Sequence, residues 1–230
     1  MFTFKQFIVQ QSKNVFPVTT DALLLGASAQ LGPAKKALEV GAGTGIISIM
    51  SAQRFPEVNI TALDIYPQAV NLATRNFSKS PFAPRLNALL KDYRKCDFHN
   101  RFDAVISNPP YFETGWASKT HENAKHQLSL TQDVLIAKSA LALKPEGKLH
   151  LILPVSNVKK VHSICAEFNL HNSRIVKIQS YPDSPVKRVI LEYRFNRNFQ
   201  FEETTFTIRL KNGDFTREYE QLMKAFHPFL

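Results

Sequence analysis

The stretch LEVGAGTGI, residues 38–46, places three glycines between two apolar segments. Residues 37–41 predict a short buried strand, and the apolar periodicity of residues 46–55 predicts a helix directly after the glycines. Glycines allow a tight turn and a close approach of the backbone to a ligand, and a helix start offers free N–H groups. The strand–turn–helix pattern therefore favours a ligand-binding turn over an ordinary loop at Gly41, Gly43 and Gly45.

This turn departs from the dinucleotide-binding fingerprint. The pattern G-x-G-x-x-G would need a glycine at position 46, where the chain has Ile46. The departure argues against a nicotinamide or flavin cofactor.

On both sides of the turn, strand-like and helix-like segments alternate. Further strands are expected within residues 58–65, 85–92, 101–111 and 148–154, and helices within residues 66–77, 130–147 and 158–169. Three more strand-like runs and a short helix follow at residues 173–180, 188–195, 206–210 and 216–226. This alternation predicts an α/β fold with a single doubly wound, mostly parallel sheet. The last strands leave little room for helices between them, which predicts an antiparallel edge near the C-terminus.

Length and composition favour one domain. The chain has 230 residues, of which 44% are hydrophobic, enough to bury one sizeable core. We expect a single monomeric domain, with residues 1–36 as an N-terminal cap segment and residues 37–230 as the core. The sequence contains no apolar run long enough to span a membrane and no secretory pattern at its start, so a cytoplasmic location without a membrane partner is expected. Cys96 and Cys165 lie in unrelated contexts and predict neither a metal site nor a disulfide.

The charge balance points to a polyanionic partner. Lys and Arg number 29 against 19 Asp and Glu, a net charge of +10. An excess of this size favours nucleic acid as a partner, although a merely basic protein is the alternative.

Two aspartates follow predicted strands at the expected ligand-binding edge of the sheet. Asp64 ends the second strand, where a carboxylate can accept hydrogen bonds from both ribose hydroxyls of a nucleoside. The alternative for Asp64 is a cap for the helix that follows. Asp92 ends the third strand, where it can meet the exocyclic amine of an adenine. The alternative for Asp92 is an ordinary turn residue.

The fourth strand ends in an unusual way, in the stretch VISNPPYFETG, residues 105–115. Two consecutive prolines fix φ and donate no backbone hydrogen bonds. Pro109 and Pro110 therefore form a stiff shelf that holds the Asn108 amide on one side and the Tyr111 ring on the other. A rigid loop without further function is the alternative for this motif alone.

Together these features resemble the class I S-adenosylmethionine-dependent methyltransferases, which have a Rossmann-like fold. The segment from Glu39 to Gly45 looks like their cofactor loop, Asp64 like their ribose-binding acid and Asp92 like the residue near the adenine. The NPPY motif resembles that of enzymes that methylate a planar nitrogen. Such a nitrogen belongs to adenine N6, to the exocyclic amine of guanine or to a glutamine side-chain amide.

The chemistry of these substrates explains the residue types in the motif. An aromatic amine is a poor nucleophile because its lone pair is delocalised into the ring. The Asn108 side-chain oxygen and the Pro109 carbonyl can each accept one N–H bond from the amine, which localises the lone pair on the incoming methyl group. Tyr111 would stack on the base beside Pro110.

Three segments resemble one particular group of these enzymes. Residues 2–28, 120–131 and 185–195 look like bacterial tRNA adenine-N6 methyltransferases that act on position 37 of valine tRNA. This resemblance implies S-adenosylmethionine as the cofactor, tRNA as the partner, and Thr20 and Asp21 near the methionine end of the cofactor. The alternative for Asp21 is a cap for the helix that follows it.

Basic residues are expected to contact the RNA. Lys125 stands where the family tends to carry arginine before a histidine, and it would contact phosphate as a point charge without bidentate geometry. An anticodon loop is expected to dock on the basic surface near Lys35, Lys36, Lys187 and Arg188.

Other methyltransferases share parts of this pattern. A release-factor glutamine methyltransferase usually carries a helical domain before the cofactor loop, and only about 40 residues precede Gly41 here. A ribosomal guanine-N2 methyltransferase usually has a duplicated domain, and DNA adenine methyltransferases usually add a recognition domain; neither fits this length. From a different class, a non-catalytic RNA-binding module on a methyltransferase fold is the remaining alternative.

Overall fold

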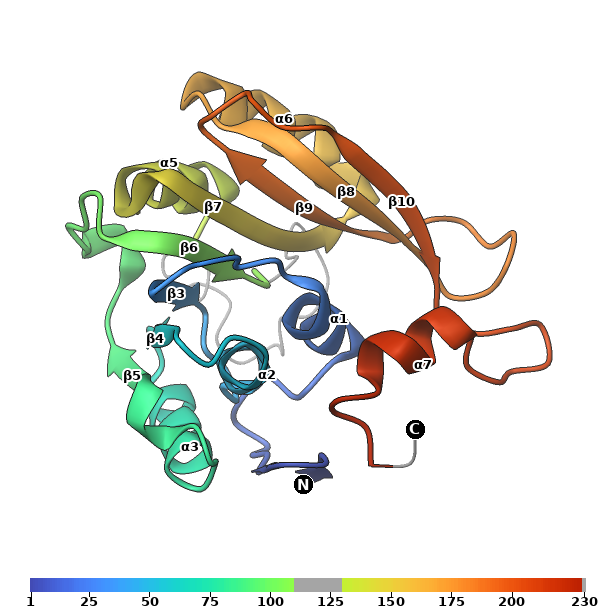
Figure 1. The fold of residues 1–230 in the computed structure, drawn as a ribbon. Helices are drawn as coiled ribbons and strands as arrows, with labels where there is room; N and C mark the ends of the chain where they lie inside the picture. Colours follow the sequence, from blue (N-terminus) through green and yellow to red (C-terminus); the bar gives the residue numbers. More distant parts are fainter. Residues whose placement is uncertain (110–129, 229–230) are drawn as a thin grey trace, which may run out of the picture.

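A computed structural model describes residues 1–109 and 130–228 of the protein (Figure 1). A mixed β-sheet lies at its centre. Eight strands of the described part hydrogen-bond in the spatial order β10-β8-β9-β7-β6-β3-β4-β5. Their bounds, in chain order, are β3 Lys36–Val40, β4 Asn59–Asp64, β5 Leu86–Leu90, β6 Phe102–Ser107, β7 Leu143–Pro154, β8 His171–Gln179, β9 Arg188–Arg194 and β10 Glu202–Thr207.

Most neighbours in this sheet are parallel. Strands β5, β4, β3, β6 and β7 run in one direction, whereas β9 lies antiparallel between β7 and β8. The outermost strand, β10, runs parallel to β8. The predicted doubly wound, mostly parallel sheet with antiparallel pairing near the C-terminus is confirmed. We call the edge at which β3 to β7 end the carboxyl edge; β9 begins there, because Arg188 pairs with Pro154.

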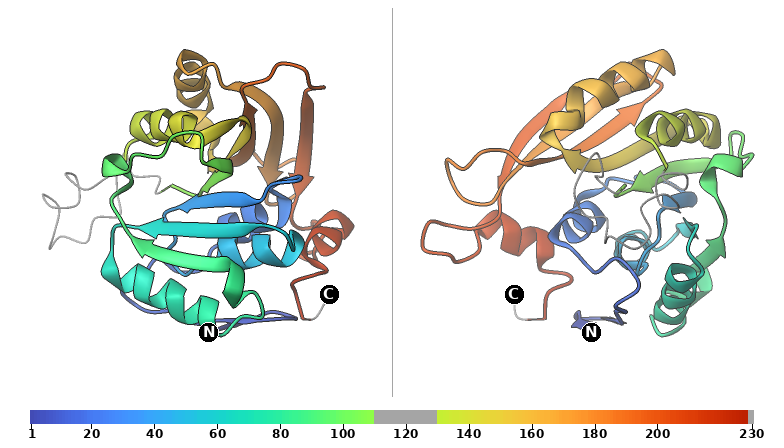
Figure 2. Two further views of the ribbon diagram at one scale, coloured as in Figure 1. Left: turned by 60° about the vertical axis from the view of Figure 1, so that its left-hand side comes forward. Right: turned by 180° about the vertical axis from the view of Figure 1, so that it is seen from behind.

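Helices cover both faces of the sheet, as the two views of Figure 2 show. One face carries α1 (Thr20–Ser28), α2 (Ile46–Arg54), α3 (Pro67–Ser78) and α7 (Arg217–Met223), and the other carries α5 (Gln132–Ala142) and α6 (Val158–Glu167). Successive residues of a strand point to opposite faces. Ala37 of β3 accordingly belongs to the core under α1 and α2, whereas Leu38 belongs to the core under α5 and α6.

The first residues of the chain pack against the end of the chain. Strands β1 (Phe2–Thr3) and β2 (Ile8–Val9) form a small antiparallel pair, and the N–H of Lys5 donates to the carbonyl of Phe226 over 2.8 Å. The two termini lie close together in both figures. This contact joins the N-terminal segment to the residues that follow α7.

Some expected boundaries differ from the observed ones. The helix expected over residues 130–147 ends at Ala142, and the chain enters β7 at Leu143. The reason is sheet pairing, because Leu143 lies opposite Phe102 at the start of β6. Long-range pairing of this kind overrides a local apolar pattern that is compatible with a helix.

Candidate cofactor and catalytic site

Three of the predicted site residues stand side by side at the carboxyl edge. Val40 pairs with Leu63 on one side and with Ser107 on the other. The next residue of each strand is Gly41, Asp64 or Asn108. Neighbouring strands lie about 4.8 Å apart, so the backbones of Asp64 and Asn108 lie roughly 10 Å apart on either side of Gly41. This is the place where the strand order reverses, the usual ligand site of such sheets.

The glycine turn is open on the side that faces this edge. Gly41 and Gly43 have φ angles of +84° and +52°, which residues other than glycine rarely adopt. A Cβ at Gly41 would meet no atom within 4 Å, and one at Gly43 would meet only the Phe16 carbonyl at 4.0 Å. Gly45 differs, because a Cβ there would lie 2.5 Å from the Phe77 ring of α3. Gly45 therefore allows helix packing, and Gly41 and Gly43 leave backbone accessible to a ligand.

Asp64 is tied to the glycine turn. Its Oδ2 accepts the N–H of Gly43 and its Oδ1 accepts the N–H of Tyr66, both over 3.0 Å. Burial raises the pKa of this carboxyl. The helix α3 begins after Tyr66 without a side-chain cap, so Asp64 supports the turn before the helix. A carboxylate has about four lone-pair positions, so Asp64 keeps acceptor capacity for a ligand.

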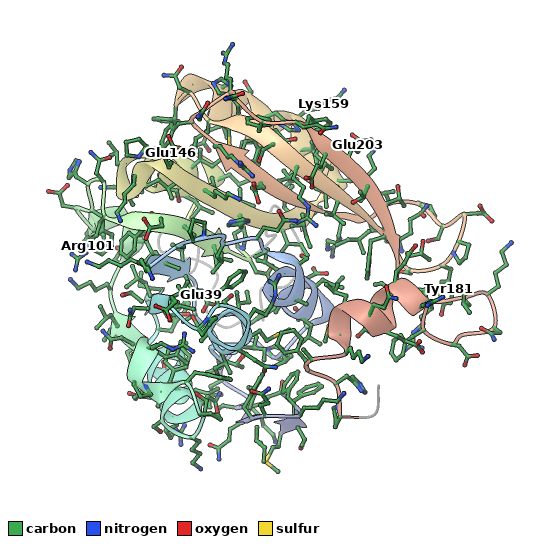
Figure 3. All side chains as sticks on the ribbon, viewed as in Figure 1. Glu39, Arg101, Glu146, Lys159, Tyr181 and Glu203 are labelled. Atoms are coloured by element: carbon green, nitrogen blue, oxygen red, sulfur yellow. The ribbon has the colours of Figure 1, made fainter. Side chains whose placement is uncertain are left out.

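Glu39 lies inside the protein between β3 and α2 (Figure 3). It is 1% exposed, and its Oε2 accepts hydrogen bonds from both the N–H and the hydroxyl of Ser48. Burial, with a smaller contribution from the charge of Asp64, raises the pKa of Glu39 from the usual 4.5 to about 8. Two carboxyl groups with raised pKa values thus flank the glycine turn.

Asp92 occupies the turn that follows β5. It accepts the N–H of Arg94 over 3.0 Å and holds the Arg94 guanidinium at 2.9 Å from Nε and 2.8 Å from Nη2. Hydrogen bonding from Arg94 lowers the pKa of Asp92. Asp92 thus acts as a turn residue, and its contact with an adenine amine stays a prediction.

The exit of β6 is fixed by its neighbour. The Ser107 hydroxyl donates to the carbonyl of Val40 over 2.8 Å, which holds the ends of β6 and β3 together. Asn108 follows half-buried and Pro109 is buried. The other predicted residues of this region, Pro110, Tyr111 and Lys125, lie outside the described residues.

The start of α1 joins the carboxyl edge through an ion pair. Asp21 in the first turn contacts Nε of Arg188 over 3.0 Å. The alternative in which Asp21 caps α1 is wrong, because the Thr19 hydroxyl accepts the N–H of Ala22 and is the cap. Thr20 is exposed next to this pair. The structure therefore brings Thr20, Asp21 and Arg188 together.

The predicted basic residues that the structure describes lie at two opposite edges of the sheet. Lys187 is exposed at the carboxyl edge, next to the start of β9. Lys36 begins β3 at the opposite edge, and Lys35 forms an ion pair there with Glu57 over 3.2 Å. A strand of five residues separates the two edges by roughly 16 Å. Lys35 and Lys36 therefore lie at the edge opposite to Gly41, Asp64 and Asn108, and their contact with RNA stays a prediction.

Sequence reasoning missed several polar residues that shape the site. Ser48, Asn76 and Ser107 are at most 1% exposed, and each makes a hydrogen bond in or beside the glycine turn. The sequence does show each of them as a polar residue on the apolar face of a predicted helix or strand, which indicates a buried polar side chain. It does not show which group that side chain hydrogen-bonds to.

Within residues 1–109 and 130–228, no group of three metal-ligating side chains could hold a metal ion. In the same part of the chain, every helix is too short or too polar to cross a membrane.

Comparison with known proteins places the chain among methyltransferases. Residues 10–178 match the methyltransferase small domain. The chain is 40% identical to a tRNA1(Val) (adenine(37)-N6)-methyltransferase from a Flavobacteriaceae bacterium (strain 3519-10), over 99% of this chain and 98% of the relative. It is 32% identical to a protein of the same name from Bacteroides thetaiotaomicron, over 100% and 98% of the two chains.

Solved structures support the fold. A predicted O-methyltransferase from Agrobacterium tumefaciens superposes with a TM-score of 0.73 at 18% identity, over 90% of this chain and 96% of that one. A precorrin-6y C5,15-methyltransferase from Geobacter metallireducens GS-15 gives a TM-score of 0.56 at 16% identity, over 82% and 94%. The family match and the near full-length relatives show that the chain belongs to the methyltransferase small domain family, among the tRNA1(Val) (adenine(37)-N6)-methyltransferases.

Proposed function

We propose that this protein methylates N6 of an adenine in a tRNA anticodon loop, at position 37 of valine tRNA, with S-adenosyl-L-methionine as the methyl donor. The observation that carries the proposal is the register of Gly41, Asp64 and Asn108 on three adjacent strands. This register brings Gly41, Asp64 and Asn108 within one ligand's reach, which supports their proposed roles as cofactor loop, ribose acid and amine acceptor. The near full-length relatives that are named for this reaction support the choice of substrate.

The residues around the glycine turn fit this cofactor. Glu39 and Asp64 both have raised pKa values because each is buried. A ligand that carries positive charge would stabilise the ionised form of both groups. S-adenosyl-L-methionine is such a ligand, and its sulfonium supplies an electrophilic methyl group. The open backbone at Gly41 and Gly43 leaves room for it.

Each proposed cofactor contact follows from its place on the carboxyl edge. Asp64 would accept the ribose hydroxyls through its remaining lone pairs. Asp92 would lie near the adenine ring of the cofactor. Glu39 would support the cofactor from beneath the glycine turn. Thr20 and Asp21 at the start of α1 would face the methionine end.

Asn108 would act directly on the substrate. Its amide oxygen and the Pro109 carbonyl would accept the two N–H bonds of the adenine amine and hold its lone pair toward the methyl donor. Asn108 is neutral and needs no base role, since the N6 proton leaves after the nitrogen has gained positive charge. Tyr111 would stack on the base, with Pro110 as the rigid support.

The RNA would approach the carboxyl edge. Lys187 is exposed there, and the net charge of +10 favours a polyanion. Lys125 remains a proposed phosphate contact. Arg188 would act in a different way, by holding α1 through Asp21 while it lies beside the bound RNA. We also propose that the chain works as one domain in the cytoplasm. The two large core clusters lie on opposite faces of a single sheet, which supports one domain.

Methyl transfer from labelled S-adenosyl-L-methionine tests the proposal. The substrates are a valine tRNA transcript, the same transcript with guanosine at position 37, ribosomal RNA and release factor, with nucleoside digestion of any labelled RNA. The proposal expects N6-methyladenosine in the first transcript and background in the second. Label in release factor or as methylguanosine would overturn the proposed substrate. Cofactor binding without label in any substrate would favour the RNA-binding module.

A further inference from the structure

One buried amide joins three parts of the chain beside the glycine turn. Asn76 of α3 has no exposed surface. Its Nδ2 donates to the carbonyl of Thr44 over 2.8 Å and to the carbonyl of Gln10 over 3.1 Å. Its Oδ1 accepts the N–H of Gln10 over 2.9 Å. Both N–H bonds of the amide are therefore used, one on the glycine turn and one on the N-terminal segment.

The N-terminal segment from residue 10 to residue 19 continues from this amide across the turn. Val15 packs in a small buried cluster with Ala69 and Leu72 of α3. The Phe16 carbonyl is the nearest atom on the open side of Gly43, at 4.0 Å from the position that a Cβ would take there. The segment then ends at Thr19, which caps α1. Residues 10–19 thus form a wall between α3 and α1, on the open side of the cofactor loop.

A second side chain shapes this wall from within. Oε1 of Gln11 accepts the N–H of Val18 over 3.0 Å, which closes the segment on itself. Gln11 is half-buried, whereas Asn76 is fully buried. Hydrogen bonds from Asn76 therefore fix the start of the wall at Gln10, and the Gln11 side chain fixes its later part at Val18.

We infer that Asn76 is a positioning residue for cofactor binding, which sets the distance between the glycine turn and the wall of residues 10–19. The hydrogen bonds of the amide go to backbone groups only, so it acts through Thr44 and Gln10. If Asn76 is removed, the Thr44 carbonyl loses a partner in a buried place, and the backbone N–H and carbonyl of Gln10 lose theirs in a partly buried one. The turn and the wall then move independently, and a cofactor site between them loses its preorganised shape. The inference rests on the proposed function for the identity of the cofactor.

A matched pair of variants separates positioning from general stability. Nδ2 of Asn172 also donates to two carbonyls, those of Arg174 and Glu192, but it lies on β8 away from the glycine turn. Asn76→Ala and Asn172→Ala thus each remove an amide that joins two backbone segments. We measure their thermal unfolding, their affinity for S-adenosylhomocysteine by calorimetry, and kcat and KM with tRNA.

For Asn76→Ala we expect an affinity for S-adenosylhomocysteine that falls about tenfold, the size of one lost hydrogen bond to a buried group. With saturating cofactor, kcat and the KM for tRNA should stay within about twofold of the wild type. Asn172→Ala should lower the melting temperature with unchanged cofactor affinity. Equal cofactor affinity in Asn76→Ala and the wild type would overturn the inference, as would a loss in kcat alone.

Gln11→Ala keeps the test decisive if Asn76→Ala does not fold. Because Gln11 is half-buried and outside α3, its removal should leave the core intact and weaken cofactor binding in the same direction by about threefold. Unchanged affinity in Gln11→Ala would contradict the role of the wall. A wild-type protein that binds no S-adenosylhomocysteine would instead overturn the proposed function together with this inference.

Discussion

The N–H of Gly43 donates to Oδ2 of Asp64 over 3.0 Å, so the acid at the end of β4 holds the glycine turn that follows β3. The same carboxyl group is expected to hold the ribose of the cofactor. Asp64 would therefore link the shape of the turn to the binding of the proposed cofactor. An observed structural contact and a proposed ligand contact fall on one side chain, and a suitable control must separate them.

Asp64→Ala should weaken cofactor binding by at least about tenfold, because it removes the ribose acceptor and frees the Gly43 amide. Asp103→Ala is the matched control. Oδ2 of Asp103 accepts the N–H groups of Lys35 and Lys36 at the opposite edge of the sheet. Calorimetric titration with S-adenosylhomocysteine measures both variants. Similar losses of affinity in the two variants would remove Asp64 from the binding site.

Glu39 should make the ligand-free protein less stable as the pH rises. Its pKa is raised from the usual 4.5 to about 8 in the folded state, so the folded chain holds a proton that the unfolded chain releases above pH 4.5. This contribution to stability is complete below the unfolded value and is lost as the pH rises through about 8.

Glu39→Gln removes this proton linkage while it keeps an acceptor for the N–H of Ser48. The melting temperature of the variant, relative to the wild type, should therefore increase steadily between pH 5 and pH 8, a window set by the raised pKa of Glu39. Glu57→Gln, a change at an exposed side chain, serves as the control. A difference between Glu39→Gln and the wild type that does not vary with pH would refute the raised pKa.

The ion pair between Asp21 and Arg188 should act as one unit. Asp21→Asn and Arg188→Gln should each lower turnover by a similar factor, because either change releases the start of α1 from β9. The double variant should lose little more than each single one, with a coupling of about 1 kcal/mol. Turnover measured over the four proteins gives this coupling. Additive losses would mean that the two residues act separately.

Two lysines allow a test of where RNA docks. Lys187 lies at the carboxyl edge and Lys35 at the opposite edge, and both are exposed. Lys187→Ala should weaken tRNA binding and reduce the slope of log affinity against log salt by about one, the effect of one lost phosphate contact. Lys35→Ala should change neither. Filter binding at several salt concentrations measures both, and equal effects of the two changes would argue against docking at the carboxyl edge.

The sequence predicts the parts of the site that depend on strand ends. Gly41, Asp64 and Asn108 each follow a recognisable apolar strand, and parallel strands bring their ends together. The partners of these residues were not predictable, because a buried side chain such as Asn76 is 66 residues from Gln10 in the sequence. The edge to which Lys35 and Lys36 belong was predictable, because both lysines precede the predicted strand of residues 37–41 and the glycine turn follows it.

The most direct measurement concerns Asn108. We compare Asn108→Ala with Asn59→Ala, an exposed asparagine at the amino end of β4, in methyl transfer to valine tRNA and in binding of S-adenosylhomocysteine. If Asn108 holds the adenine amine, Asn108→Ala should lose kcat on the order of a hundredfold, the usual effect of one lost transition-state contact, with cofactor affinity nearly unchanged. Asn59→Ala should match the wild type in both. Near-normal turnover in Asn108→Ala would contradict the proposed mechanism.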